Sequence, residues 1–167
     1  MLINHTDPLL HRSNTMVSDD ELADNCKALQ PILGLMYTTM STYNALGISA
    51  CQIGFDKTMF MMNINNQTKI CINPEMIAAN LKMGLAKEGC LSFHSLFLTV
   101  RRPIAVAVRY FDETGKQVTE QLDDLEARVF LHEFDHINGI CFTDRVSKLQ
   151  LDIGLRKQTK LTKGSNK

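Results

Sequence analysis

Residues 123–139 read DDLEARVFLHEFDHING, and this stretch decides the fold and the chemistry of the chain. Asp123 with Glu126 three positions later is typical of a capped helix start. Gly139 is typical of the residue that follows a helix end. The segment therefore predicts a helix that runs from Asp123 to about Asn138.

Most of the circumference of this helix is apolar. At 100° per residue, Leu125, Val129, His132 and His136 share one stripe, and Glu133 lies beside it. The opposite side carries apolar side chains, namely Ala127, Phe130, Phe134 and Ile137. We therefore expect the helix to be buried on most sides, with its two histidines facing an apolar pocket.

His132, Glu133 and His136 form an H-E-x-x-H motif. Histidines four residues apart lie one above the other on a helix, so both imidazoles can bind one metal ion. The glutamate beside the first histidine can reach a water bound to that ion. The motif predicts a metal centre, and the alternative is a chance match with two buried structural histidines.

A catalytic site of this kind needs a third protein ligand and one open position. Phe142 stands where one class of zinc peptidases has a third histidine, and no glutamate follows Glu133, as a second class requires. In Glu88–Ser92 (EGCLS), the thiolate of Cys90 would complete a tetrahedral site with two histidines. The residues alone leave other candidate ligands open: His94, Cys141, Asp144 and Asp152.

A third segment, Gly47–Gln52 (GISACQ), combines small residues with one amide. Small residues allow another backbone to approach closely. The side chain of Gln52 offers both a hydrogen-bond donor and an acceptor. Taken alone, the segment fits a tight turn as well as it fits part of an active site.

The surrounding pattern predicts an α+β fold. Ser18 and Glu21 form a capping box that opens a long helix to about Tyr43, with a kink or break at Pro31. Strands are then expected at Thr58–Ile64, Lys69–Ile72, Leu96–Arg101, Ile104–Phe111 and Gln117–Gln121. We expect antiparallel or mixed sheets packed around the helix that carries the metal motif, with a long N-terminal helix.

Composition narrows the class of protein. The 167 residues are 44% hydrophobic with zero formal net charge, which suits one catalytic domain at 1–150 and disfavours a DNA-binding protein. A basic tail at 151–167, partly helical, should follow.

No apolar run approaches the roughly 20 residues of a membrane span, and no targeting segment is evident, so we expect a cytoplasmic protein. Five irregularly spaced cysteines suggest free thiols.

The three segments, in this order, resemble the motifs of the peptide deformylase family, which are G-Φ-G-Φ-A-A-x-Q, E-G-C-L-S and Q-H-E-x-D-H with Φ apolar. Here they are residues 45–52, 88–92 and 131–136. Weaker similarity, at Asp7–Leu10 and Ile72–Glu75, extends the resemblance over the chain to about Val146. It implies an α+β fold in which the metal helix lies among antiparallel sheets.

The resemblance also implies the roles of individual residues. Cys90, His132 and His136 would bind one divalent ion, Fe(II) in the cell, with zinc, nickel or cobalt also able to occupy the site. Glu133 would be the general acid/base.

In the same family pattern, Gln52 and the backbone N–H of Leu91 would stabilise the developing oxyanion. The implied reaction removes the formyl group from the N-formylmethionine of nascent polypeptides and releases formate. The ribosome is then an expected neighbour. We expect Leu46, Leu125 and Val129 to line a slot for the methionine side chain, and the Gly47 backbone to pair with the peptide.

Four residues depart from the family pattern. Ala45 replaces the first glycine and Ser49 the first alanine of the small-residue motif, and we expect both to affect loop geometry rather than chemistry. Leu131 replaces a glutamine, which we expect to change packing, and Phe97 replaces an arginine, which we expect to change preference beyond the methionine. The rival hypotheses are a zinc peptidase that cuts internal peptide bonds and a metal-binding module without activity.

Overall fold

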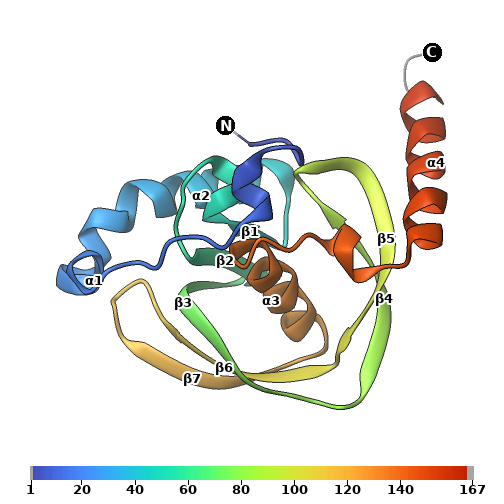
Figure 1. Ribbon diagram of the computed structural model, residues 1–167. Helices are drawn as coiled ribbons and strands as arrows, with labels where there is room; N and C mark the ends of the chain where they lie inside the picture. Colours follow the sequence, from blue (N-terminus) through green and yellow to red (C-terminus); the bar gives the residue numbers. More distant parts are fainter. Residues whose placement is uncertain (1, 165–167) are drawn as a thin grey trace.

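The structure is a computed structural model that describes residues 2–164 (Figure 1). In chain order its elements are η1 Pro8–His11, α1 Asp19–Cys26, η2 Lys27–Leu29, α2 Gln30–Tyr43, β1 Gly47–Ser49, η3 Ala50–Ile53, β2 Met59–Ile64, β3 Gln67–Ala79, β4 Met83–Cys90, β5 Phe93–Pro103, β6 Ala105–Phe111, β7 Gln117–Asp123, α3 Asp124–Ile137, η4 Phe142–Arg145 and α4 Lys148–Gly164. The predicted α+β class is confirmed.

Two antiparallel sheets form the framework. One has five strands in the order β1-β2-β3-β6-β7, and the other is the hairpin of β4 and β5. The turn between β2 and β3 is Asn65–Asn66, and both residues have the positive φ that such a tight hairpin turn requires. β3 pairs with β2 through its first half and with β6 through its second half, with a register shift after Ile72.

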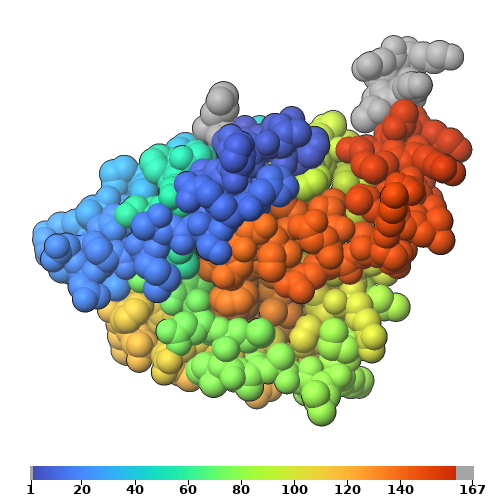
Figure 2. All heavy atoms as spheres, in the orientation of Figure 1, coloured from blue at the N-terminus to red at the C-terminus, as the bar shows by residue number. Residues whose placement is uncertain are grey.

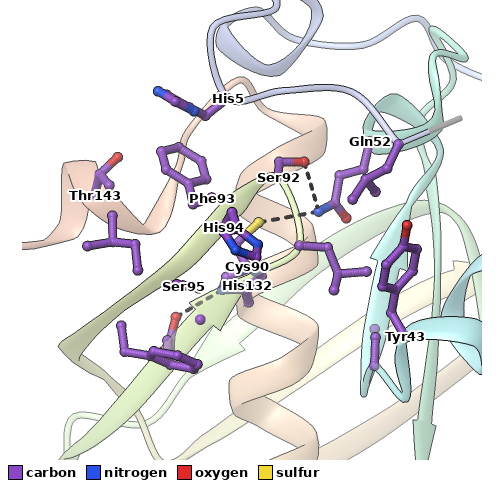
Figure 3. A pocket seen from close by; sticks show the side chains of 18 of the residues that line it. His5, Tyr43, Gln52, Cys90, Ser92, Phe93, His94, Ser95, His132 and Thr143 are labelled. Carbon is purple, nitrogen blue, oxygen red and sulfur yellow. Dashed lines mark hydrogen bonds and ion pairs between the residues drawn. The ribbon is translucent and has the colours of Figure 1, made fainter. Parts of the chain in front are cut away.

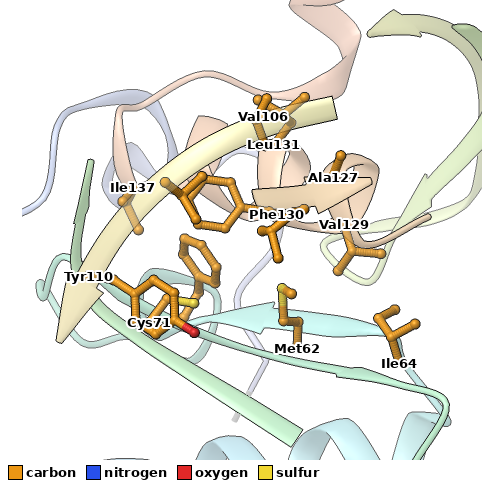
Figure 4. Close-up of a cluster of buried hydrophobic side chains, with 13 residues drawn as sticks. Met62, Ile64, Cys71, Val106, Tyr110, Ala127, Val129, Phe130, Leu131 and Ile137 are labelled. Atoms are coloured by element: carbon orange, nitrogen blue, oxygen red, sulfur yellow. The ribbon is translucent and has the colours of Figure 1, made fainter. Parts of the chain in front are cut away.

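Helix α3 lies at the centre of the molecule, enclosed by the strands (Figure 1). Its apolar side packs into a cluster with the five-stranded sheet, where the Phe130 ring meets the Phe60 ring edge-on at 5.1 Å between centroids (Figure 4). Ala127, Phe130 and Ile137 are buried, as the helical periodicity predicts. Leu131 also packs in this cluster.

The N-terminal helical region covers the predicted residues but is interrupted. Ser18 forms the predicted capping box with Glu21. The interruption lies at Ala23–Cys26, where Asp24, Asn25 and Cys26 have positive φ. Pro31 instead lies in the first turn of α2, where its missing N–H costs no helical hydrogen bond.

Strand β4 is an element that the sequence pattern does not predict. Its residues 83–90 include Gly84 and Gly89, and glycine has a low strand propensity. Pairing with β5 over its whole length compensates for this, with Met83 opposite Pro103 and Cys90 opposite Phe93. The hairpin places Cys90 at the end of β4 and Leu91 in the following turn.

The last described element is helix α4, which stands at one edge of the molecule and packs against β5 (Figures 1 and 2). Gly154 allows this contact, because a Cβ there would lie 2.4 Å from Leu98 Cδ2. The expected boundary between 150 and 151 falls within α4, so the division into a domain and a tail stays a prediction. Residues 165–167 of that expected tail lie outside the described residues. No described helix is long and apolar enough to cross a membrane.

The N-terminal segment closes the end of α3. Figure 2 shows the first residues of the chain beside the segment that follows α3, and a bridge joins Ser13 to Asn138. Gly139 has a φ of +74°, and a Cβ there would lie 2.6 Å from the Arg12 backbone. The glycine that was expected to end the helix is therefore also required for this close approach.

Candidate active site

Three potential metal ligands converge where the β4–β5 hairpin meets α3. The ligand atoms of Cys90, His132 and His136 all lie within 4.8 Å of one another, and Cys90 Sγ is 3.2 Å from His136 Nε2. Figure 3 shows the Cys90 sulfur and the His132 ring at the same cavity. His136 is fully buried.

Glu88 orients one of the two imidazoles. Its Oε2 lies 3.0 Å from His132 Nδ1, so Nδ1 carries the proton and Nε2 is free to bind a metal. Burial by itself raises the pKa of Glu88, but hydrogen bonds from His132 and Arg102 outweigh burial and hold the pKa at about 2. Glu88 is therefore an anion near neutral pH.

A buried ionic network surrounds Glu88 and ties β4, β5 and α3 together. Arg102 donates from Nε to Glu88 Oε1 at 2.7 Å and from Nη2 to Oε2 at 2.9 Å. Its Nη1 donates to Asp135 Oδ2 at 2.8 Å. Arg128 also contacts Glu88, and Arg145 contacts Asp135. The Arg102 guanidinium thus links β4, which carries Cys90, to α3, which carries His132 and His136.

The two oxygens of Glu133 have different surroundings. Ser49 donates its hydroxyl hydrogen to Oε2, with Oγ at 2.6 Å, and both residues are buried. Oε1 lies beside Gly47, where a Cβ would be only 2.7 Å away, and it accepts no hydrogen bond from the described residues. Burial raises the pKa of Glu133, which suits a general base near neutral pH.

This contact bears on the expectation for Ser49. We expected the change from alanine to affect loop geometry rather than chemistry. The Ser49 hydroxyl bonds directly to the predicted general base. The sequence carries no signal for this contact, because Ser49 and Glu133 are 84 residues apart.

The amide of Gln52 faces the sulfur of Cys90. The N–H of Ser49 donates to Gln52 Oε1 at 2.9 Å, which turns Nε2 toward Cys90 Sγ at 3.3 Å and Ser92 Oγ at 3.4 Å (Figure 3). Leu91 follows Cys90 directly, so its backbone N–H is adjacent to the same sulfur. Both predicted oxyanion donors therefore lie next to the ligand group.

The predicted site residues other than the buried His136 share one cavity. Leu46, Gly47, Gln52, Cys90, Leu91, Leu125, Val129, His132 and Glu133 all line it. Val129 is buried, whereas Leu46 and Leu125 are each about half exposed at its mouth. The residues that sequence reasoning left without a role are Glu88, Arg102 and Ser49. Glu88 alone had a usable signal, because it lies in the same EGCLS segment as Cys90.

The other candidate third ligands lie outside the ligand group. Asp144 Oδ2 accepts a hydrogen bond from Cys141 N, and Cys141 Sγ lies 3.8 Å from Leu10 O. His94 lines the cavity but does not belong to the group, nor does Asp152 in α4. Among the described residues, the structure thus favours Cys90 as the ligand that joins the two histidines.

One thiolate and two imidazoles form a donor set that suits a divalent transition metal with one open position. Cys90 and His132 both line the cavity, so an ion held by this group would be accessible from it. Over residues 1–152 the chain matches the model of the polypeptide deformylase family. The chain belongs to the peptide deformylase family. It is a metal-binding hydrolase that removes the formyl group from N-formylmethionine of nascent polypeptides, as the sequence predicts.

Known deformylases resemble this one over most of their length. The peptide deformylase of Thermotoga neapolitana is 38% identical over 141 residues, which cover 84% of this chain and 82% of the relative. The peptide deformylase of Bartonella henselae is 36% identical over 165 residues, with coverage of 96% and 91%.

Solved deformylase structures share the fold. The enzyme from Synechococcus elongatus in complex with actinonin superposes with a TM-score of 0.86 at 31% identity, covering 95% of this chain and 85% of that one. The class I type b enzyme from Acinetobacter baumannii, bound to Met-Ala-Ser, has a TM-score of 0.82 at 28% identity, with coverage of 87% and 97%.

Proposed function

We propose that this deformylase works through one divalent cation held by Cys90, His132 and His136, with Glu133 as general acid/base. The observation that carries the proposal is the convergence of these three ligand atoms within 4.8 Å of one another, beside a cavity that Cys90 and His132 line together with Glu133. Bound there, the cation supplies Lewis-acid chemistry that makes water acidic enough to serve as the nucleophile near neutral pH.

Glu133 moves the proton. Its Oε1 is the oxygen without a hydrogen bond from the described protein, so it accepts the proton of the attacking water. The same oxygen then delivers that proton to the amine that leaves as the amide bond breaks. The tight space between Oε1 and Gly47 limits where the carboxylate can swing during these two steps.

Gln52 and Leu91 stabilise the negative charge that develops on the formyl oxygen. Gln52 Nε2 and the Leu91 N–H are donors next to Cys90, and the protein holds them in place before the reaction starts. Each preorganised donor of this kind is worth about 3–4 kcal/mol of transition-state stabilisation.

The methionine side chain of the substrate enters the slot between Val129, Leu46 and Leu125. All three are apolar and line the same cavity as Glu133. Support comes from the Acinetobacter baumannii relative, which binds Met-Ala-Ser, a peptide that begins with methionine. The Gly47 backbone, free of a side chain, pairs with the extended peptide.

Fe(II) is the proposed ion in the cell, with zinc, nickel or cobalt able to replace it. A mixed set of one thiolate and two imidazoles accepts all four ions, because such ligands bind borderline transition metals well. We further propose that the protein acts in the cytoplasm close to the ribosome, because its formylated substrate emerges there.

The test is formate release from formyl-Met-Ala-Ser by protein purified anaerobically and loaded with iron. We expect turnover by the parent protein and almost complete loss in Glu133→Ala, with the metal content unchanged. Glu126→Ala is the matched control, because Glu126 lies on the same helix but outside the cavity. Cleavage of an internal peptide bond without formate release would favour a zinc peptidase, and no turnover of any peptide would favour a binding module.

A further inference from the structure

We propose that Ser49 is a positioning residue that holds two catalytic groups at once. Its hydroxyl fixes the carboxylate of Glu133, and its backbone N–H fixes the amide of Gln52. The inference rests on the proposed roles of Glu133 and Gln52 and goes beyond them, because Ser49 itself touches neither the metal ligands nor the open part of the cavity.

The hydroxyl distinguishes the two oxygens of the base. Ser49 Oγ is 2.6 Å from Glu133 Oε2 and 3.3 Å from the Glu133 carbonyl oxygen. A hydroxyl has one hydrogen to donate, and the shorter, charge-assisted bond to the carboxylate takes it. With Oε2 occupied, Oε1 is left beside Gly47 to exchange the proton.

The backbone N–H of Ser49 determines how Gln52 is oriented. An N–H can only donate, so the atom of Gln52 that meets it at 2.9 Å must be the amide oxygen. The amide nitrogen is thereby turned toward Cys90 Sγ, where an oxyanion donor is needed. An amide flipped by 180° would present its oxygen to the developing negative charge and oppose the reaction.

Ser49 is well placed for both tasks because it is rigid. It is the last residue of β1, where it pairs with Phe60 of β2, and it is the N-cap of η3 with an extended backbone. Its side chain is fully buried. Helix α3 and the η3 turn therefore meet at a residue whose backbone is fixed by the sheet.

The experiment compares Ser49→Ala with the parent enzyme, both loaded with the same metal. Alanine keeps the N–H that orients the Gln52 amide and suits the extended backbone, while the hydrogen bonds of the Ser49 hydroxyl, including the one to Glu133 Oε2, are lost. We expect kcat for formyl-Met-Ala-Ser to fall about tenfold, a fraction of the 10²–10⁴ that a positioned general base contributes. KM and metal content should remain as in the parent, and a crystal structure of the zinc-loaded variant should show the Glu133 carboxylate rotated.

A matched control separates this effect from the loss of any buried hydroxyl. Thr58 is buried and donates its hydroxyl to the Asn14 carbonyl, outside the cavity. Thr58→Val should leave kcat unchanged. Formate release by the parent protein tests the proposed function separately, because the Ser49 inference concerns only the ratio of variant to parent.

Two results would overturn the inference. One is a Ser49→Ala enzyme with the kcat of the parent and an unmoved carboxylate. The other is a loss of kcat that is accompanied by equal loss of bound metal, which would make Ser49 part of the general framework. If Ser49→Ala fails to fold, Ser49→Gly removes the same hydroxyl. A lower kcat at unchanged metal content would then support the inference, and a kcat equal to that of the parent would overturn it.

Discussion

His132 Nδ1 and Glu88 Oε2 lie 3.0 Å apart, although the two residues belong to different elements, α3 and β4. Glu88 is two residues before Cys90 and on the same face of the strand, so one segment supplies both a metal ligand and the group that orients another ligand. The metal site is therefore built by docking a strand end onto a helix.

Removing the Glu88 carboxylate should weaken metal binding. Glu88→Gln loses the charge that fixes the His132 tautomer, so we expect the metal affinity to fall 10–100-fold. The measurement is zinc retention against a competing chelator. Glu75→Gln is the control, because Glu75 makes an exposed ion pair with Arg109. Equal retention in Glu88→Gln and the parent would show that the carboxylate does not support the site.

Arg102 should matter for folding far more than a surface arginine. Its side chain is 4% exposed, and Arg102→Met leaves Glu88 and Asp135 without their shared partner. We expect a loss of about 3–5 kcal/mol in the free energy of unfolding, measured by urea denaturation of the zinc-loaded protein. Arg109→Met, at a side chain that is 45% exposed, should cost about 0–1 kcal/mol. Similar losses in the two variants would contradict the structural role of the network.

Gly47 should be intolerant of any side chain. A Cβ would lie 2.7 Å from Glu133 Oε1 and 3.0 Å from Val129 Cγ1, so Gly47→Ala displaces the base. We expect kcat to fall about 100-fold, the usual cost of a shift of about 1 Å in a catalytic group, with metal content preserved. Gly34→Ala has open space in α2 and should retain full activity. A fully active Gly47→Ala enzyme would show that Glu133 is not confined here.

Val129 should set the depth of the methionine slot. It is buried at the inner side of the cavity, so Val129→Phe fills the slot. We expect kcat/KM for formyl-Met-Ala-Ser to fall about 10–200-fold, the range that small volume changes in an apolar pocket produce. Formyl-Gly-Ala-Ser, which has no side chain there, should be affected much less. Equal losses for both peptides would place the methionine elsewhere.

Much of the site could be predicted because three of its residues lie close together in the sequence. His132, Glu133 and His136 are fixed relative to one another by helical spacing, and a capped amphipathic pattern places them on a buried helix. Cys90 was one candidate among several from the residues alone. The family resemblance favoured it, and the structure brings it to the histidines.

The rest depends on contacts between segments that are distant in the chain. The bonds of Ser49 to Glu133 and of Arg102 to Asp135 span 84 and 33 residues, so no periodicity predicts them. Strand β4 escaped prediction because two glycines weaken its local propensity, and only pairing with β5 makes it a strand. The interruption at Asp24–Cys26 lies where no proline or glycine marks it.

X-ray absorption spectroscopy of the zinc-loaded protein tests the central claim, that Cys90, His132 and His136 hold one ion, most directly. We predict one sulfur at about 2.3 Å together with imidazole nitrogens at about 2.0–2.1 Å, and loss of that sulfur in Cys90→Ala. A spectrum with nitrogen and oxygen ligands alone, or a sulfur that persists in Cys90→Ala, would contradict it.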